Sequence, residues 1–356
     1  MQTGTFFLSL AEKLVRHPKR IVFPEGTNPQ VVRAAAHYAR LRLGPVVLLG
    51  KPELIRRQAK IQRVDLDRVM LLDPVHGQDR QMFVDHLRGH AGNEKLRLGA
   101  IQDRLSDPIL YATLMLRFNQ VDGLVAGVGA YSGSVLRPLI KMIPRLPQFS
   151  RISSATILEC PDKTVGDGGL LIAGDAAVVP TPKAEELAAT AVGLAALKLQ
   201  LTGRRARVAL LSYSTKGSAA ANEEIRKVTE ATRKAQQLAS KIGVKADIDG
   251  ELQIDAALHP AKAKLKAAGS PVAGRADCLV FPDLSAGNIC IKAIQQFGNV
   301  RTYGNILLGL RLPAAEISRG ADEQEVLGVA AIVGLLAVEY RKLYPEPSAP
   351  SESRNI

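Results

Sequence analysis

Side chains that could bind a small anion gather directly after predicted β-strands, where ligands collect in open α/β sheets. Residues 122–133 are rich in glycine and lead into a helix that carries Arg137. Glycines let backbone N–H groups approach an anion, and a helix N-terminus adds partial positive charge. We therefore assign Ser132 in this loop to substrate binding, with a tight turn that binds nothing as the alternative.

A second segment combines hydroxyl groups with a lysine, as phosphate-binding loops do. Ser214, Thr215 and Lys216 follow a predicted strand near residues 207–213 and precede a predicted helix near 220–241. Their spacing differs from that of a Walker loop, which disfavours a nucleoside triphosphatase. We assign all three to substrate binding.

Two further segments place polar residues at predicted helix starts. Residues 281–288 end at Asn288, which is followed one helical turn later by Lys292. We assign both side chains to substrate binding, although a helix cap would also explain Asn288. Residues 316–325 place a serine and an arginine before acidic residues that open a helix. Taken alone, that pattern is typical of a capped helix whose acidic first turn complements the helix dipole.

The elements that must position these residues alternate along the chain. Apolar runs with β-branched residues alternate with helical patterns from about residue 20, which predicts βα units on a mostly parallel sheet. One predicted helix, residues 28–42, has an apolar face, a cap at Asn28 and Pro29 at its first position. That face consists of Val31, Ala34, Ala35, Tyr38 and Leu41.

A stretch without a clear element divides the chain. Residues 144–155 contain two prolines and a serine pair, which indicates a crossover between two series of strands and helices. We therefore predict a domain boundary there. The Pro/Ser-rich residues 345–356 are predicted to form a disordered tail.

Composition narrows the function classes. The net charge of +13 is spread along the 356 residues, so it favours small anionic ligands, with nucleic-acid binding as an alternative. Aromatic residues make up only 4% and tryptophan is absent, which argues against stacking on single-stranded nucleic acid.

Cysteine usage and hydropathy indicate the compartment. Cys160, Cys278 and Cys290 form no CxxC pair, so neither a disulfide framework nor a zinc knuckle is predicted. No apolar run reaches the ~18 residues of a membrane span, and the N-terminus lacks a signal-peptide pattern. We therefore expect a soluble cytoplasmic protein that binds no membrane.

Seven stretches, in order and spread over nearly the whole chain from about 20 to 340, resemble the phosphate acetyl/butyryltransferase family. They are IVFPEG (21–26), VDGLVAG (121–127), LRPLI (136–140), SYSTKGSA (212–219), GELQIDAAL (250–258), GSPVAGRADCLVFPDLSAGN (269–288) and EISRG (316–320).

The resemblance implies a two-domain α/β protein, similar in fold to isocitrate and isopropylmalate dehydrogenases, with the active site in the interdomain cleft. The first domain would comprise residues 1–152 and 309–356, and the second residues 153–308. It also implies a homodimer that reversibly transfers an acetyl group between coenzyme A and phosphate, giving acetyl phosphate, with coenzyme A as substrate and neither a permanent cofactor nor a metal. Butyryl or propionyl transfer is the alternative.

The resemblance also implies roles for individual residues. Ser318 and Arg319 would lie at the catalytic centre, and Glu325, where the family usually has Asp, would be the base for the coenzyme A thiol. Arg137 and Arg88 would bind substrate. The chain also lacks the usual histidine of the loop after VDGLVAG, around Ala130.

Rival interpretations remain open. Two departures from the family pattern, the missing loop histidine and Glu325 in place of the usual Asp, suggest a non-catalytic family member that acts as a scaffold. His86 and His90, four residues apart, suggest a metal pair, although no third ligand is near in sequence. Three acidic residues suggest a metal-dependent dehydrogenase with a nicotinamide cofactor. These are Asp175, Asp255 and Asp283.

Overall fold

The structure, a computed structural model, describes residues 5–89 and 98–343. The helices of these residues are α1 (Thr5–Arg16), α2 (Pro29–Arg40), α3 (Pro52–Gln62), α4 (Arg80–Arg88), α5 (Leu98–Arg104), α6 (Pro108–Arg117), α7 (Ser132–Met142), α8 (Ala184–Thr202), α9 (Glu223–Ile242), α10 (Ile254–Leu258), α11 (Pro260–Lys266), α12 (Leu284–Phe297) and α13 (Glu323–Leu343). The strands are β1 (Ile21–Phe23), β2 (Val46–Leu49), β3 (Val69–Leu72), β4 (Gly123–Ala126), β5 (Ser153–Glu159), β6 (Leu170–Gly174), β7 (Ala206–Leu211), β8 (Ala246–Leu252), β9 (Cys278–Val280), β10 (Arg301–Leu308) and β11 (Ala314–Glu316). The predicted tail, residues 345–356, and His90 lie outside the described residues.

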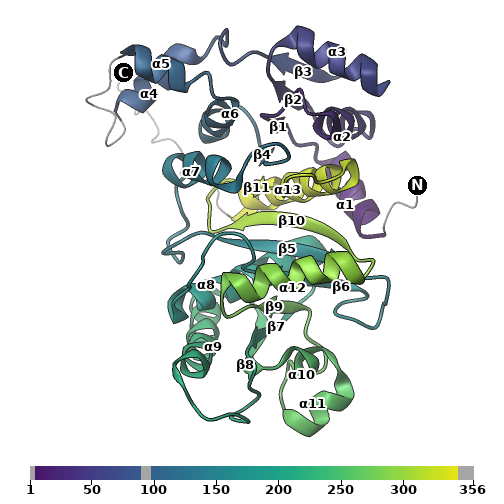
Figure 1. Cartoon of the computed structure of the whole chain (residues 1–356), viewed down its shortest axis with the longest axis vertical. Helices are drawn as coiled ribbons and strands as arrows, with labels where there is room; N and C mark the ends of the chain where they lie inside the picture. The colour runs from purple at the N-terminus through teal and green to yellow at the C-terminus, as the bar shows by residue number, and fades with distance from the viewer. Residues whose placement is uncertain (1–4, 90–97, 344–356) are drawn as a thin grey trace, which may run out of the picture.

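One sheet runs through the molecule in the strand order β3-β2-β1-β4-β11-β10-β5-β6-β9-β7-β8 (Figure 1). Strand β10 is antiparallel to β11 and to β5, and β5 is antiparallel to β6. The other neighbouring pairs are parallel. The predicted mostly parallel α/β fold is confirmed. The predicted crossover at 144–155 is too long by three residues, because β5 already begins at Ser153.

Helices cover both faces of this sheet, as the alternation within β1 illustrates. Ile21 and Phe23 pack into one hydrophobic cluster, which also holds side chains of α2, α8 and α13. The residue between them, Val22, packs into another cluster with side chains of α4, α6 and α7. Because both faces are covered, β1, β2 and β4 are apolar along their length, as the sequence pattern indicated.

Helix α2 begins where the sequence predicts it to begin. The side chain of Asn28 accepts hydrogen bonds from the backbone N–H groups of Gln30 and Val31, and a proline occupies the first turn. The expected apolar face is buried except at Leu41, which is 41% exposed because the helix ends one residue earlier, at Arg40.

The end of the described chain returns to its beginning. Helix α13 packs against α1, α2 and β4, and β11 pairs in parallel with β4 (Figure 1). This return agrees with a first domain completed by the C-terminal segment. The domain limits themselves stay a prediction.

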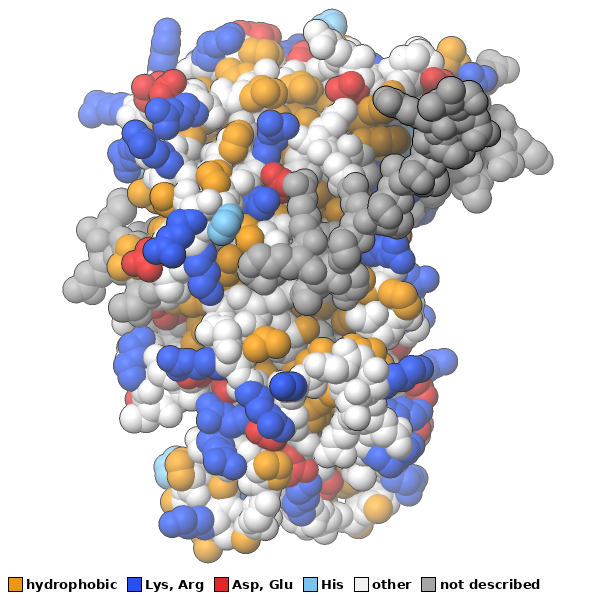
Figure 2. Space-filling view, turned by 180° about the vertical axis from the view of Figure 1, so that it is seen from behind, with side chains coloured by type: hydrophobic (Ala, Val, Ile, Leu, Met, Phe, Trp, Pro, Cys, Tyr) orange, Lys and Arg blue, Asp and Glu red, His pale blue; other side chains and the backbone are white. Residues whose placement is uncertain are grey.

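Basic side chains are scattered over the surface. On the face seen in Figure 2, lysines and arginines alternate with acidic, polar and apolar side chains from one end of the molecule to the other. Among the described residues, no helix is both long enough and apolar enough to cross a membrane.

Candidate active site

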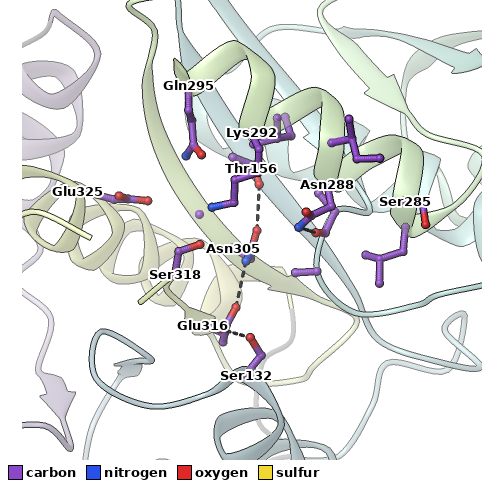
Figure 3. Close-up of a pocket in the computed structure, with 16 residues that line it drawn as sticks. Ser132, Thr156, Ser285, Asn288, Lys292, Gln295, Asn305, Glu316, Ser318 and Glu325 are labelled. Atoms are coloured by element: carbon purple, nitrogen blue, oxygen red, sulfur yellow. Dashed lines mark hydrogen bonds between the residues drawn. The ribbon is translucent and has the colours of Figure 1, made fainter. Parts of the chain in front are cut away.

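A cavity of about 370 Å³ opens at the carboxyl ends of several strands (Figure 3). Its walls come from the start of α7 after β4, the loop after β6, helix α12 after β9, and the β11–α13 connection. Residues of β5 and β10 line it between these walls. Ligand sites of α/β proteins are expected at the carboxyl ends of strands.

The cavity brings together predicted site residues that are far apart in the sequence. Ser132, Asn288, Lys292, Ser318 and Glu325 all line it. Figure 3 shows Lys292 reaching from α12 toward Ser318 and the carboxylate of Glu325.

A close approach of two loops holds Ser318 in place. The N–H of Ile317 donates to the carbonyl oxygen of Ala126 at 2.7 Å, which fastens the β11–α13 connection to the end of β4. Gly127 lies against Ile317 with a φ of +120°, and a Cβ there would be 2.3 Å from the carbonyl oxygen of Ile317. Only glycine fits this position, so Ser318 depends on the glycine of the VDGLVAG stretch.

Burial sets the protonation of Glu325. The pKa of its carboxyl group is raised from 4.5 to about 7, mainly by burial and also by the negative charge of Asp322, although the charge of Lys292 lowers it. A carboxylate with a pKa near 7 can accept and release a proton at neutral pH.

A hydrogen-bond chain of four side chains crosses one wall of the cavity, and only one of them, Ser132, is a site residue predicted from the sequence. Ser132 Oγ donates to Glu316 Oε1 at 2.7 Å, Asn305 Nδ2 donates to Glu316 Oε2 at 3.0 Å, and Thr156 Oγ1 lies 3.0 Å from Asn305 Oδ1 (Figure 3). Glu316 is only 2% exposed. The available signal was a polar residue directly before an apolar run, as at Asn305 before Ile306, Leu307 and Leu308 in β10.

The glycine-rich loop after β4 binds a group of the protein itself. The carboxylate of Glu25 accepts the backbone N–H groups of Gly127, Val128 and Gly129 at 2.7, 3.1 and 2.6 Å. The expectation that this loop offers backbone N–H groups to a ligand is therefore wrong for these three. Their hydrogen bonds go to Glu25, the acidic residue of the IVFPEG stretch.

Three arginines that were predicted to be site residues are exposed and are not among the residues that line the cavity. Arg319 follows Ser318 directly, Arg137 lies on α7, and Arg88 is the last residue of α4. Their roles stay predictions.

Ser214, Thr215 and Lys216 lie after β7 and are likewise absent from the cavity lining. Ser214 Oγ donates to Glu251 at 3.0 Å, and Lys216 Nζ forms a salt bridge with Asp249 at 2.5 Å. Both acidic residues belong to the neighbouring strand β8. The structure thus gives this loop internal partners, and its substrate-binding role stays a prediction.

The acidic residues of the dehydrogenase interpretation are each engaged by the protein. Asp175 accepts four backbone N–H groups, including that of Val179 at 2.7 Å. Asp283 caps α12, and Asp255 pairs with Lys266 at 2.8 Å. The ring of His86 packs edge-on against a phenylalanine. In the described part of the chain, no group of three His, Cys, Asp or Glu residues is arranged to hold a metal ion.

Comparisons with known proteins agree with this geometry. The family model described as phosphate acetyl/butaryl transferase matches residues 5–334. The chain is 36% identical over 329 residues to a phosphate acetyltransferase of Thermoanaerobacterium thermosaccharolyticum, covering 92% of this chain and 98% of that protein.

Solved structures lead to the same family. A phosphotransacetylase from Streptococcus pyogenes superposes with a TM-score of 0.85 at 31% identity, covering 95% of this chain and 100% of that one. A 4-hydroxythreonine-4-phosphate dehydrogenase from Klebsiella pneumoniae, at 15% identity and a TM-score of 0.50, covers 90% of this chain and 99% of that one and shares the fold alone. The resemblance found in the sequence is confirmed, and the chain belongs to the phosphate acetyl/butaryl transferase family.

Proposed function

We propose that this protein is a phosphate acetyltransferase, which reversibly transfers an acetyl group between coenzyme A and inorganic phosphate. One observation carries the proposal. The cavity brings a carboxylate with a pKa near 7, Glu325, together with a lysine and a serine, Lys292 and Ser318. Names of relatives 34–37% identical to this chain support the acetyl group as substrate.

In the direction of acetyl-CoA formation, Glu325 removes the proton of the coenzyme A thiol. An unperturbed thiol has a pKa of about 8.5, so only a few per cent is ionised at neutral pH without a base. The thiolate attacks the carbonyl carbon of acetyl phosphate. The new C–S bond forms, the C–O bond to phosphate breaks, and phosphate leaves with the electron pair. In the reverse direction protonated Glu325 returns the proton.

Positive groups near the cavity stabilise the charge that develops on the phosphate and on the carbonyl oxygen. Lys292 reaches the cavity from α12 and forms no salt bridge with any residue in the described ranges. We propose that Arg319, exposed beside Ser318, turns its guanidinium group to the phosphate when substrate binds, and that Ser318 donates a hydrogen bond. Removing one such donor costs about 3 kcal/mol of transition-state stabilisation.

The remaining assignments are proposals that rest on the family. We propose that the protein is a cytoplasmic homodimer without a permanent cofactor, and that its two domains comprise residues 1–152 with 309–356, and 153–308. Arg137 and Arg88, together with the loop of Ser214, Thr215 and Lys216, would bind the anionic parts of the substrates.

The test is an assay of the purified protein with acetyl-, propionyl- and butyryl-coenzyme A and phosphate. We expect turnover to be fastest with the acetyl substrate, and Arg319→Ala to lose about two orders of magnitude in kcat. Arg233→Ala removes an exposed arginine of α9 and serves as the matched control, with wild-type turnover expected.

A preference for butyryl-coenzyme A would replace the acetyl assignment with butyryl transfer. A protein that forms no acyl phosphate from any of the three acyl-coenzyme A substrates would be a non-catalytic member of the family. Equal rates for Arg319→Ala and wild type would refute the role of Arg319.

A further inference from the structure

The hydrogen-bond chain through Ser132, Glu316, Asn305 and Thr156 has a direction. Ser132 Oγ and Asn305 Nδ2 both donate to the side-chain oxygens of Glu316. Because the amide nitrogen of Asn305 faces Glu316, its oxygen faces Thr156. Thr156 must therefore donate to Asn305. The buried carboxylate of Glu316 thus fixes the orientation of every group in the chain.

This direction decides what the wall can offer a ligand. A hydroxyl group has one proton and two lone pairs. The protons of Ser132 and Thr156 are used inside the chain, and both residues line the cavity. Their remaining hydrogen-bonding capacity consists of lone pairs. Asn305 Nδ2 keeps a second N–H besides the one that it donates to Glu316, so the wall formed by Ser132, Glu316, Asn305 and Thr156 offers acceptors at both hydroxyl groups and one amide donor. We call it the acceptor wall, after the two hydroxyl groups.

An acceptor wall suits one part of the proposed substrates and disfavours another. Phosphate and acyl phosphate present acceptor oxygens and negative charge, which the lone pairs and the carboxylate of Glu316 repel. The pantetheine arm of coenzyme A carries two amide N–H groups, which are neutral donors. The positive side chain in the cavity lining, Lys292, comes from α12 rather than from this wall.

We propose that the acceptor wall is the specificity-determining surface for the pantetheine arm of coenzyme A, with Ser132 and Thr156 accepting its amide N–H groups. Phosphate then binds on the side of the cavity that holds Lys292. This inference rests on the proposed function, because it presumes coenzyme A as the thiol substrate. It replaces the expectation that the loop of Ser132 binds an anion.

The test compares Ser132→Ala and Thr156→Val with wild type by calorimetric titration of coenzyme A, pantetheine and inorganic phosphate. Each variant removes one acceptor, so we expect the Kd of coenzyme A and of pantetheine to rise about three- to tenfold. The Kd of phosphate should stay within about twofold of the wild-type value. Because pantetheine lacks the nucleotide, an equal loss for both thiols assigns the contact to the arm.

Two controls separate this role from a structural one. Ser134→Ala removes a hydroxyl of the same helix that donates to the carbonyl oxygen of Tyr131 and does not line the cavity, so its Kd values should match wild type. Thr156→Ser keeps the hydroxyl and should restore the coenzyme A affinity that Thr156→Val loses. Failure of this rescue would overturn the role of Thr156.

A third variant changes the direction of the chain. Glu316→Gln replaces one carboxylate oxygen, an acceptor, with an NH₂ group, a donor. Ser132 or Asn305 can then accept a hydrogen bond from this NH₂ group, and the hydroxyl or amide proton that it no longer gives to residue 316 can be donated to a ligand in the cavity. We expect weaker binding of coenzyme A and phosphate binding that is unchanged or tighter. If the variants weaken phosphate binding and leave coenzyme A unchanged, the inference is overturned while the proposed function stands. If wild type binds no coenzyme A and forms no thioester, both are overturned.

Discussion

Glu325 on α13 and Lys292 on α12 interact across the cavity, and the charge of Lys292 lowers the pKa that burial raises in Glu325 (Figure 3). A carboxylate pushed toward protonation is poor at forming a stable ion pair and well suited to exchanging protons. The interaction also links the protonation of the base, Glu325, to the binding of phosphate, which we assign to Lys292. Arrival of a phosphate dianion near Lys292 would offset its charge and make Glu325 a stronger base.

The rate of acetyl-CoA formation should fall as the pH drops below about 7, because Glu325 then becomes protonated and cannot accept the thiol proton. Glu325→Gln should lower kcat by about 10²- to 10⁴-fold. It should also abolish the fall in rate at low pH, which we call the acidic limb of the pH profile. A pH profile of kcat/KM for both proteins measures the effect. A variant that keeps both the wild-type rate and the limb would show that another group is the base.

Two substitutions beside Glu325 should move this limb in opposite directions. Asp322→Asn removes a negative charge that raises the pKa of Glu325 but keeps an oxygen to cap the N–H of Glu325, so the limb should shift to lower pH. Lys292→Gln removes the charge that lowers this pKa, so the limb should shift to higher pH. Shifts of a few tenths to about one pH unit are expected. Shifts in the same direction would contradict the assignment of the limb to Glu325.

Glu325 should also destabilise the fold at neutral and alkaline pH. Its pKa is raised from 4.5 to about 7 in the folded protein, so the folded state favours the protonated form, and stability falls as pH rises through this window. Glu325→Gln removes the penalty. We expect its free energy of unfolding to exceed that of wild type by up to about 3 kcal/mol at pH 8 and to equal it below pH 4. Urea unfolding at both pH values measures the difference, and an equal gain at both would refute this cause.

Gly127→Ala should damage both stability and catalysis. A Cβ at this position meets the carbonyl oxygen of Ile317 at 2.3 Å, and the φ of +120° is unfavourable for alanine, so we expect a loss of about 2–4 kcal/mol and a displaced Ser318. Gly129→Ala is the control in the same loop, where the nearest atom is a side-chain oxygen of Glu25 at 3.3 Å rather than backbone at 2.3 Å. Thermal unfolding and kcat should separate the two variants. Equal effects would show that the loop approach does not hold Ser318.

The sequence predicted the parallel part of the fold because apolar strands and amphipathic helices alternate with clear periods. It did not predict β5, β8 or the mutually antiparallel pair β10 and β11, since the residues of this pair carry no alternation that distinguishes them from a connection. The strands β10 and β11 matter for the site. Their pairing brings Asn305 and Glu316 together across the sheet, a relationship that spacing in the sequence does not reveal.

The polar and basic residues that follow predicted strands identified only part of the site. Ser318, Glu325 and Lys292 line the cavity as their motifs suggested. Lys216 carries an equally suggestive pattern, but its charge is paired with Asp249 on a neighbouring strand. Whether a lysine after a strand faces a ligand or an acidic side chain depends on the strand beside it, which the local sequence does not specify.

A crystal structure of the protein with coenzyme A and phosphate tests the mechanism most directly. The mechanism predicts the sulfur within about 3–4 Å of the Glu325 carboxylate and beside Ser318, with phosphate next to Lys292. A sulfur bound far from Glu325, outside the cavity at the carboxyl ends of β4 and β11, would contradict it.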